Sequence, residues 1–137
     1  MTAREFLLKQ LSDSEKQLSV AIKGLDAEMA EARPYPDGMT IREQLHHLAE
    51  TTVATIAAYE GREHEWGTWD PENRSWEGVK EAWRTGRQAA IASLPDTEEG
   101  LWEAHAYLLA HDYYHVGQIA AARRTVQPGW TSFELYE

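Results

Sequence analysis

The chain lacks cysteine altogether and is poor in basic residues, and both deficits narrow its chemistry. Without a Cys among 137 residues, disulfides, thiolate metal ligands and cysteine nucleophiles are excluded. Acidic residues outnumber basic ones by 23 to 13, which gives a net charge of −10, and no stripe of Lys or Arg interrupts this excess. Because nucleic acids and anionic lipid surfaces are bound by clustered basic side chains, we expect no nucleic-acid partner and no membrane partner.

Long hydrophobic runs are also missing. No stretch approaches the roughly 20 apolar residues of a membrane-spanning helix. The first residues, Met1 to Glu5, contain no apolar signal core, so we expect a cytoplasmic protein. The remaining balance, 42% hydrophobic and 26% charged, suits a single globular domain over residues 1–137. Six His and six Trp stand out against this composition.

Four segments repeat their apolar residues at helical spacing, and we expect helices at about 3–31, 40–60, 75–94 and 97–126. Each begins at a residue that can cap it: Thr2, Thr40, Ser75, and either Asp96 or Thr97. Residues 61–74 predict a long loop that carries two of the Trp residues, Trp66 and Trp69. No segment has a convincing strand pattern. The sequence therefore predicts an all-α fold, an antiparallel up-and-down four-helix bundle.

Two histidines lie in the middle of the apolar stripe of the fourth helix. His111 and His115 are four residues apart, so their rings project from the same face about 5–6 Å apart at Cβ. Two core histidines bonded to backbone or carboxylate groups are the conventional explanation. A buried pair of imidazoles, however, repels when protonated and leaves donors and acceptors unpaired when neutral. A divalent metal ion solves both problems, and the spacing favours a metal site.

A third ligand is expected from the second helix, which offers His46 and His47. Neither lies at the centre of the apolar stripe, and helical geometry leaves the choice between them nearly even, although the small residues beside His47 favour it slightly. His64 falls in the polar loop, where we expect it to be solvated. His105 lies about 120° around the fourth helix from His111 and is expected to be peripheral.

Two segments resemble the DinB/YfiT family of metalloenzymes. The first, Thr40-Ile-Arg-Glu-Gln-Leu-His-His-Leu-Ala-Glu50, is similar to the family's capped helix in which a His precedes Leu-Ala-Glu or Leu-Ala-Asp. The second, His111-Asp-Tyr-Tyr-His-Val-Gly-Gln-Ile119, is similar to the family's His-x-x-x-His-x-Gly-Gln segment. The resemblance spans most of the chain and selects His47 over His46. The chain departs from the family at Met39, where relatives often have Trp.

The resemblance implies a four-helix bundle, commonly a homodimer, with one divalent metal ion held by His47, His111 and His115. Zinc and nickel are the metals it implies. It further implies a metalloenzyme with a small-molecule substrate, and thiol-dependent S-transferases are among the family's characterised members. A hydrolase is the alternative that a metal-bound water would favour. An open position on a three-His metal could hold water or a substrate thiolate. Because the chain has no Cys, such a thiol would come from a low-molecular-weight cosubstrate.

Two other functions remain open at this point. The bundle could be non-catalytic, with a structural or sensory metal site. A di-iron carboxylate protein is less favoured, because the apolar stripes of the first and third helices offer no inward carboxylates.

Several residues near the three histidines are candidates for supporting hydrogen bonds: Glu50, Thr51, Asp112 and Gln118. For Glu50 and Asp112, ordinary solvated helix surface is the favoured interpretation. Gly117 is unusual inside a helix, and we expect it to mark the close approach of a neighbouring helix.

Overall fold

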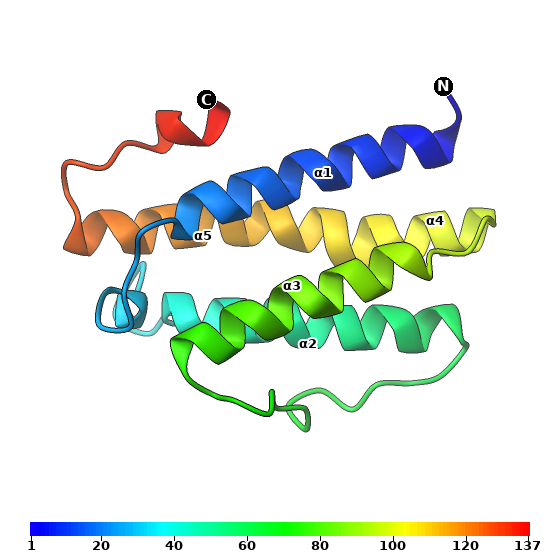
Figure 1. Cartoon of the computed structure of the whole chain (residues 1–137), viewed down its shortest axis with the longest axis horizontal. Helices are drawn as coiled ribbons and strands as arrows, with labels where there is room; N and C mark the ends of the chain where they lie inside the picture. Colours follow the sequence, from blue (N-terminus) through cyan, green and yellow to red (C-terminus); the bar gives the residue numbers. More distant parts are fainter.

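Helices make up the regular structure of the chain, which a computed structural model describes over all 137 residues. Its elements are α1 (Ala3–Ile22), the short 3-10 helix η1 (Met29–Glu31), α2 (Ile41–Tyr59), α3 (Trp76–Ala92), α4 (Glu98–Ala104), the π-helical turn η2 (His105–Leu109), α5 (Ala110–Val126) and the 3-10 helix η3 (Ser132–Tyr136). Because α4, η2 and α5 follow one another without a break, the bundle has four long helical segments (Figure 1). The predicted all-α four-helix bundle is confirmed.

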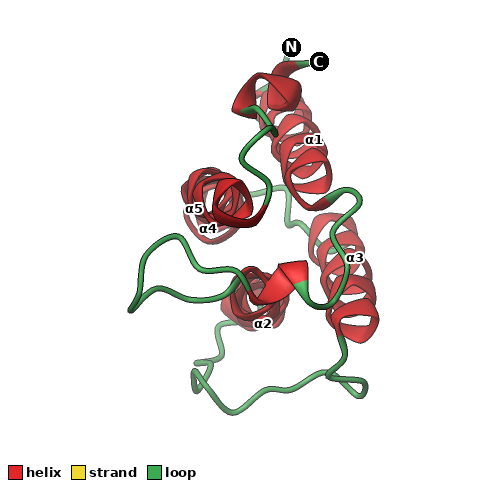
Figure 2. Ribbon diagram, turned by 90° about the vertical axis from the view of Figure 1, so that its left-hand side faces the viewer, coloured by secondary structure: helices red, strands yellow, loops and turns green.

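The four segments surround a common core, with α1 and α3 on one side and α2 and the α4–α5 segment on the other (Figure 2). Residues 60–75 run back along the length of the molecule, so α2 and α3 point in the same direction (Figure 1). A strict up-and-down alternation would have placed them antiparallel. The difference follows from the long connection, which returns the chain to the end where α2 began and leaves α3 to run beside it.

Local capping explains where the helices begin. The Thr2 hydroxyl accepts a hydrogen bond from the backbone N–H of Glu5, and the Glu5 carboxylate accepts one from Thr2 N–H, which is the predicted capping box. Thr40, Ser75 and Thr97 cap α2, α3 and α4 through equivalent hydroxyl contacts. These four helix starts are therefore determined by local sequence.

The first helix is shorter than its periodicity predicts. It was expected to reach residue 31, but α1 ends at Ile22. Gly24 adopts a positive φ of 79°, which turns the chain away from the helix axis, and the apolar residues that follow form a separate turn at η1. Leu25 still reaches the core and Met29 packs against it, which is why their spacing resembled that of a continuous helix.

Two helical glycines have opposite surroundings. A Cβ at Gly86 of α3 would overlap the hydroxyl of Thr52, so the absence of a side chain allows α2 and α3 to approach closely. A Cβ at Gly117 of α5 would meet no other atom within 4 Å. The expectation that Gly117 marks a close helix approach is therefore wrong.

None of the helices combines the length and the apolar character that crossing a membrane requires.

Candidate metal centre

Three histidine side chains from two helices meet inside the bundle. His47 comes from α2, and His111 and His115 come from successive turns of α5. The centre of the His47 ring lies 5.4 Å from the centres of both other rings, and the rings of His111 and His115 are stacked with their centres 6.0 Å apart. The structure thus brings together the three histidines that the sequence and the family resemblance single out.

Burial keeps two of these imidazoles neutral near pH 7. His115 is only 4% exposed, and burial, reinforced by the neighbouring rings of His47 and His111, lowers its pKa to about 4. The pKa of His47 is also lowered, first by burial and then by His111. Neutral imidazole has one nitrogen with a free lone pair, which is the form that binds metal ions.

His115 is held by a residue that sequence reasoning missed. Its Nδ1 lies 2.8 Å from Oε1 of Gln44, an α2 residue that is 2% exposed. A signal for Gln44 was present in the sequence. Residues 41, 44, 45 and 48 share one helix face. Because the other three are apolar, this pattern predicts that Gln44 also faces the core.

Three of the four candidates for supporting hydrogen bonds do not bond to the histidine rings. The Thr51 hydroxyl donates to the backbone carbonyl of His47, and not to its ring. Asp112 is 1% exposed and binds Arg87 at 2.8 Å and Ser14 at 2.7 Å, so the expectation that it is solvated is wrong. Gln118 is half-buried and makes no hydrogen bond.

The fourth candidate, Glu50, is buried as well. It is 4% exposed, and its carboxylate accepts a hydrogen bond from the backbone N–H of Gly67 at 2.8 Å. Nε2 of His64 lies 3.3 Å from Glu50 Oε1 and has no hydrogen-bond partner. Because the His64 side chain is only 12% exposed, the expectation that it is solvated is also wrong. Helix α2 and the 60–75 connection therefore meet around one buried carboxylate.

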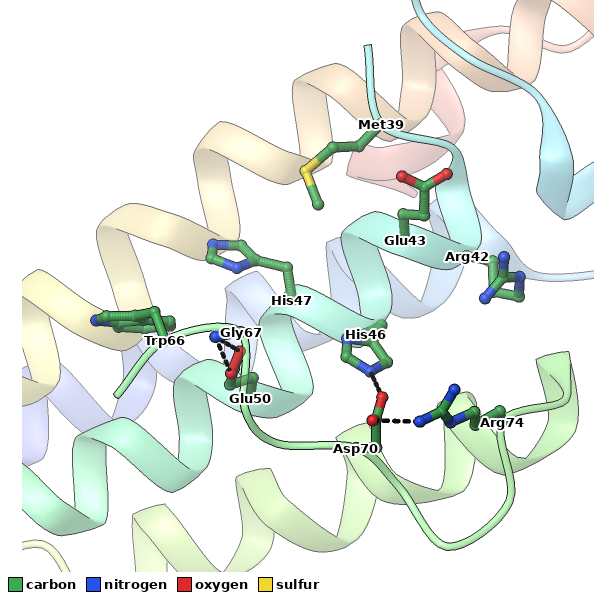
Figure 3. Close-up of a pocket in the computed structure, with 10 residues that line it drawn as sticks. All are labelled: Met39, Arg42, Glu43, His46, His47, Glu50, Trp66, Gly67, Asp70 and Arg74. Atoms are coloured by element: carbon green, nitrogen blue, oxygen red, sulfur yellow. Dashed lines mark hydrogen bonds and ion pairs between the residues drawn. The ribbon is translucent and has the colours of Figure 1, made fainter. Parts of the chain in front are cut away.

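A cavity of about 520 Å³ opens beside His47. Its wall combines α2 with the 60–75 connection and is lined by Met39, Arg42, Glu43, His46, His47, Glu50, Trp66, Gly67, Asp70 and Arg74. The indole of Trp66 lies 5.6 Å from the His47 ring, centre to centre. Figure 3 shows Met39 and Trp66 on either side of His47. The cavity thus presents an imidazole flanked by two apolar side chains.

The neighbouring histidine is directed to a different partner. Nε2 of His46 lies 3.1 Å from Asp70 Oδ1, and Asp70 also pairs with Arg74 (Figure 3). His105 is exposed and stacks on Trp102 with a ring separation of 5.3 Å. The peripheral position expected for His105 is confirmed.

As the side chains stand, no group of three or more His, Asp or Glu residues is arranged to hold a metal ion. The three imidazoles are close neighbours, but their nitrogen atoms do not form a metal cage.

Comparison with protein families places this arrangement in a known group. Residues 10–119 match the family model described as the DinB superfamily, which covers α2, α3 and all three clustered histidines. No match was found among the curated proteins or among the solved structures. Since the family model covers most of the chain, the protein belongs to the DinB superfamily.

Proposed function

We propose that this protein binds one divalent metal ion through His47, His111 and His115 and uses it as a metal-dependent enzyme acting on a small molecule. The observation that carries the proposal is the convergence of three imidazoles with ring centres 5.4, 5.4 and 6.0 Å apart, one of which, His47, lines a cavity. Three imidazoles bound to one tetrahedral ion have ring centres about 5.3 Å apart, given metal–nitrogen distances of about 2.0–2.1 Å. The observed spacings are close to this value.

The donor chemistry fits a divalent transition metal. Imidazole nitrogens suit zinc and nickel, and a chain without Cys supplies no thiolate to compete. The lowered pKa values of His47 and His115 keep these rings ready to bind without loss of a proton near pH 7. Since the helix backbones already bring the rings within this range, turning the rings is the adjustment that binding requires.

The residues around the cavity support catalysis rather than a purely structural role. A three-His ion has an open position, where it acidifies a bound water or a substrate thiol. Met39 and Trp66 flank His47 with apolar surface, while Glu50 brings a carboxylate to the same cavity. Glu50 is our candidate to accept a proton from a bound substrate, because it lies on α2 one turn after His47. We therefore favour a transferase or hydrolase reaction, with a low-molecular-weight thiol as a candidate cosubstrate.

A structural or sensory metal site is the second candidate, and the cavity beside His47 argues against it, because a closed structural site leaves no space for substrate. The positions of the carboxylates argue against a di-iron centre. The buried residues of α1 and α3 include no Asp or Glu, and Asp112 is committed to Arg87.

Elemental analysis tests the proposal. Protein expressed without a His tag should carry, or take up from zinc or nickel solution, about one ion per chain. His111→Ala should lose this ion, whereas His105→Ala, which removes an exposed histidine, should keep it. Wild-type protein that takes up neither metal in stoichiometric amount would overturn the proposal.

A further inference from the structure

The side chain of Gln44 bridges His115 and the main chain at the start of α2. Its Oε1 lies 2.8 Å from His115 Nδ1, and its Nε2 donates to the backbone carbonyl of Met39 at 3.3 Å. Gln44 is 2% exposed, so water does not compete for either contact. The amide is therefore confined between one fixed carbonyl and one imidazole.

The chemistry of these groups determines where the protons lie. A backbone carbonyl can only accept, so the NH₂ end of the Gln44 amide must face Met39. The carbonyl end then faces His115 and can only accept, which requires a proton on His115 Nδ1. A neutral imidazole has one N–H and one lone pair, so the lone pair of His115 is on Nε2.

We propose that Gln44 is a positioning residue that holds His115 in its Nδ1–H tautomer and leaves Nε2 as the nitrogen available to an ion. Met39 acts one step further back, because its carbonyl fixes the orientation of the Gln44 amide. Met39 also contributes its side chain to the cavity wall. One residue therefore borders the cavity with its side chain and, through Gln44, orients His115 with its carbonyl. The significance for metal binding rests on the proposed function; the tautomer itself does not.

Nitrogen NMR on metal-free protein tests the tautomer directly. With ¹⁵N-labelled histidine at pH 8, long-range ¹H–¹⁵N correlations distinguish Nδ1–H from Nε2–H imidazole. We expect wild-type His115 to be Nδ1–H, Gln44→Leu to shift it toward Nε2–H, and Gln44→Glu, which restores an acceptor oxygen, to return it. A wild-type Nε2–H tautomer, or an unchanged tautomer in a folded Gln44→Leu variant, overturns the inference.

Zinc affinity provides the second measurement, by competition with a chromophoric chelator. Loss of a hydrogen-bond acceptor behind a metal-binding histidine weakens affinity roughly ten- to hundredfold. We expect this loss in Gln44→Leu and its rescue in Gln44→Glu. Gln118→Leu is the matched control, because Gln118 lies on α5 and makes no hydrogen bond; its affinity should equal that of the wild type.

The two measurements separate the two proposals. Wild-type protein that binds neither zinc nor nickel contradicts the proposed function but leaves the tautomer test intact. Zinc binding by Gln44→Leu at wild-type affinity overturns the positioning role and leaves the metal site standing. Circular dichroism and thermal unfolding establish that each variant is folded.

Discussion

The guanidinium of Arg87 lies 2.8 Å from the carboxylate of Asp112 in the middle of the bundle, where both side chains are at most 2% exposed. Arg87 also donates to the backbone carbonyl of Leu11, and the Ser14 hydroxyl donates to Asp112. The pair therefore ties α3, α5 and α1 together. Because Asp112 follows His111 directly, this contact also fixes the rotation of α5 that directs His111 and His115 inward.

Arg87→Met should destabilise the protein strongly. The change removes the cation and leaves Asp112 buried without a charged partner, which typically costs about 3–5 kcal/mol in free energy of unfolding. Urea denaturation measures the loss. Arg62→Ala, which removes an exposed ion pair with Glu60, should change the same quantity by less than about 1 kcal/mol. Equal urea midpoints for Arg87→Met and the wild type would contradict the structural role assigned to the pair.

Alanine at Gly86 and alanine at Gly117 should change the free energy of unfolding in opposite directions. Gly86→Ala introduces a methyl group that overlaps the Thr52 hydroxyl, so either Thr52 must give up its bond to Ala49 or α2 and α3 must separate, and the free energy of unfolding should fall by about 1–3 kcal/mol. Gly117→Ala meets open space on a helix and should raise it by about 0.5–1 kcal/mol. Each variant controls for the other, because the chemical change is identical. Thermal unfolding that moves both in the same direction would show that the packing around one glycine is misassigned.

The sequence predicted the features that depend on local chemistry and periodicity. Helix starts at Thr2 and Thr40 follow from hydroxyl caps, and the inward position of His115 follows from the spacing of apolar residues along α5. Single-chain periodicity could not identify contacts between distant segments. Asp112 and Glu50 looked like surface carboxylates because their partners, Arg87 and the Gly67 backbone, come from other elements.

The long connection limited the prediction in a second way. His64 lies in a polar stretch whose composition predicts solvent exposure, yet the connection packs against α2 and buries the ring beside Glu50. The end of α1 was missed because Leu25 and Met29 keep a helical spacing although they lie in a turn and in η1. In both places the path of the chain in three dimensions, and not the residue pattern, determined burial.

Acid should destabilise the metal-free protein partly through His115. Burial, reinforced by His47 and His111, lowers the pKa of His115 to about 4 from its ordinary value of 6.5, so between these values the unfolded chain binds more protons than the folded one. The contribution of His115 to the free energy of unfolding is therefore fully present above pH 6.5 and is lost as the pH falls toward 4. A shift of this size corresponds to on the order of 3 kcal/mol.

The pH effect can be isolated with a pair of variants. Urea unfolding with EDTA at pH 7.5, 6 and 5 measures the slope of stability against pH. His115→Leu should flatten this slope, and His105→Ala, at an exposed position, should keep the wild-type slope. Carboxylates contribute equally to all three proteins and cancel in the comparison. A His115→Leu slope equal to that of the wild type would show that His115 titrates normally in the folded chain.

Glu50 should hold the 60–75 connection against the cavity. Its carboxylate accepts from the N–H of Gly67, where a φ of 83° turns the chain directly after Trp66. A hydrogen bond to a charged group contributes about 1.5–3 kcal/mol, so Glu50→Ala should increase hydrogen exchange at the Gly67 amide roughly ten- to hundredfold. The indole NMR resonance of Trp66, which is already 45% exposed, should shift as the ring moves away from His47. Glu50→Gln keeps an acceptor oxygen, so its exchange rate at Gly67 should lie between those of the wild type and Glu50→Ala. Glu65→Ala changes an exposed residue of the same connection and should leave both signals unchanged. If Gly67 exchanges at the wild-type rate in Glu50→Ala, other contacts hold the connection, and Glu50 is then free to serve the cavity alone.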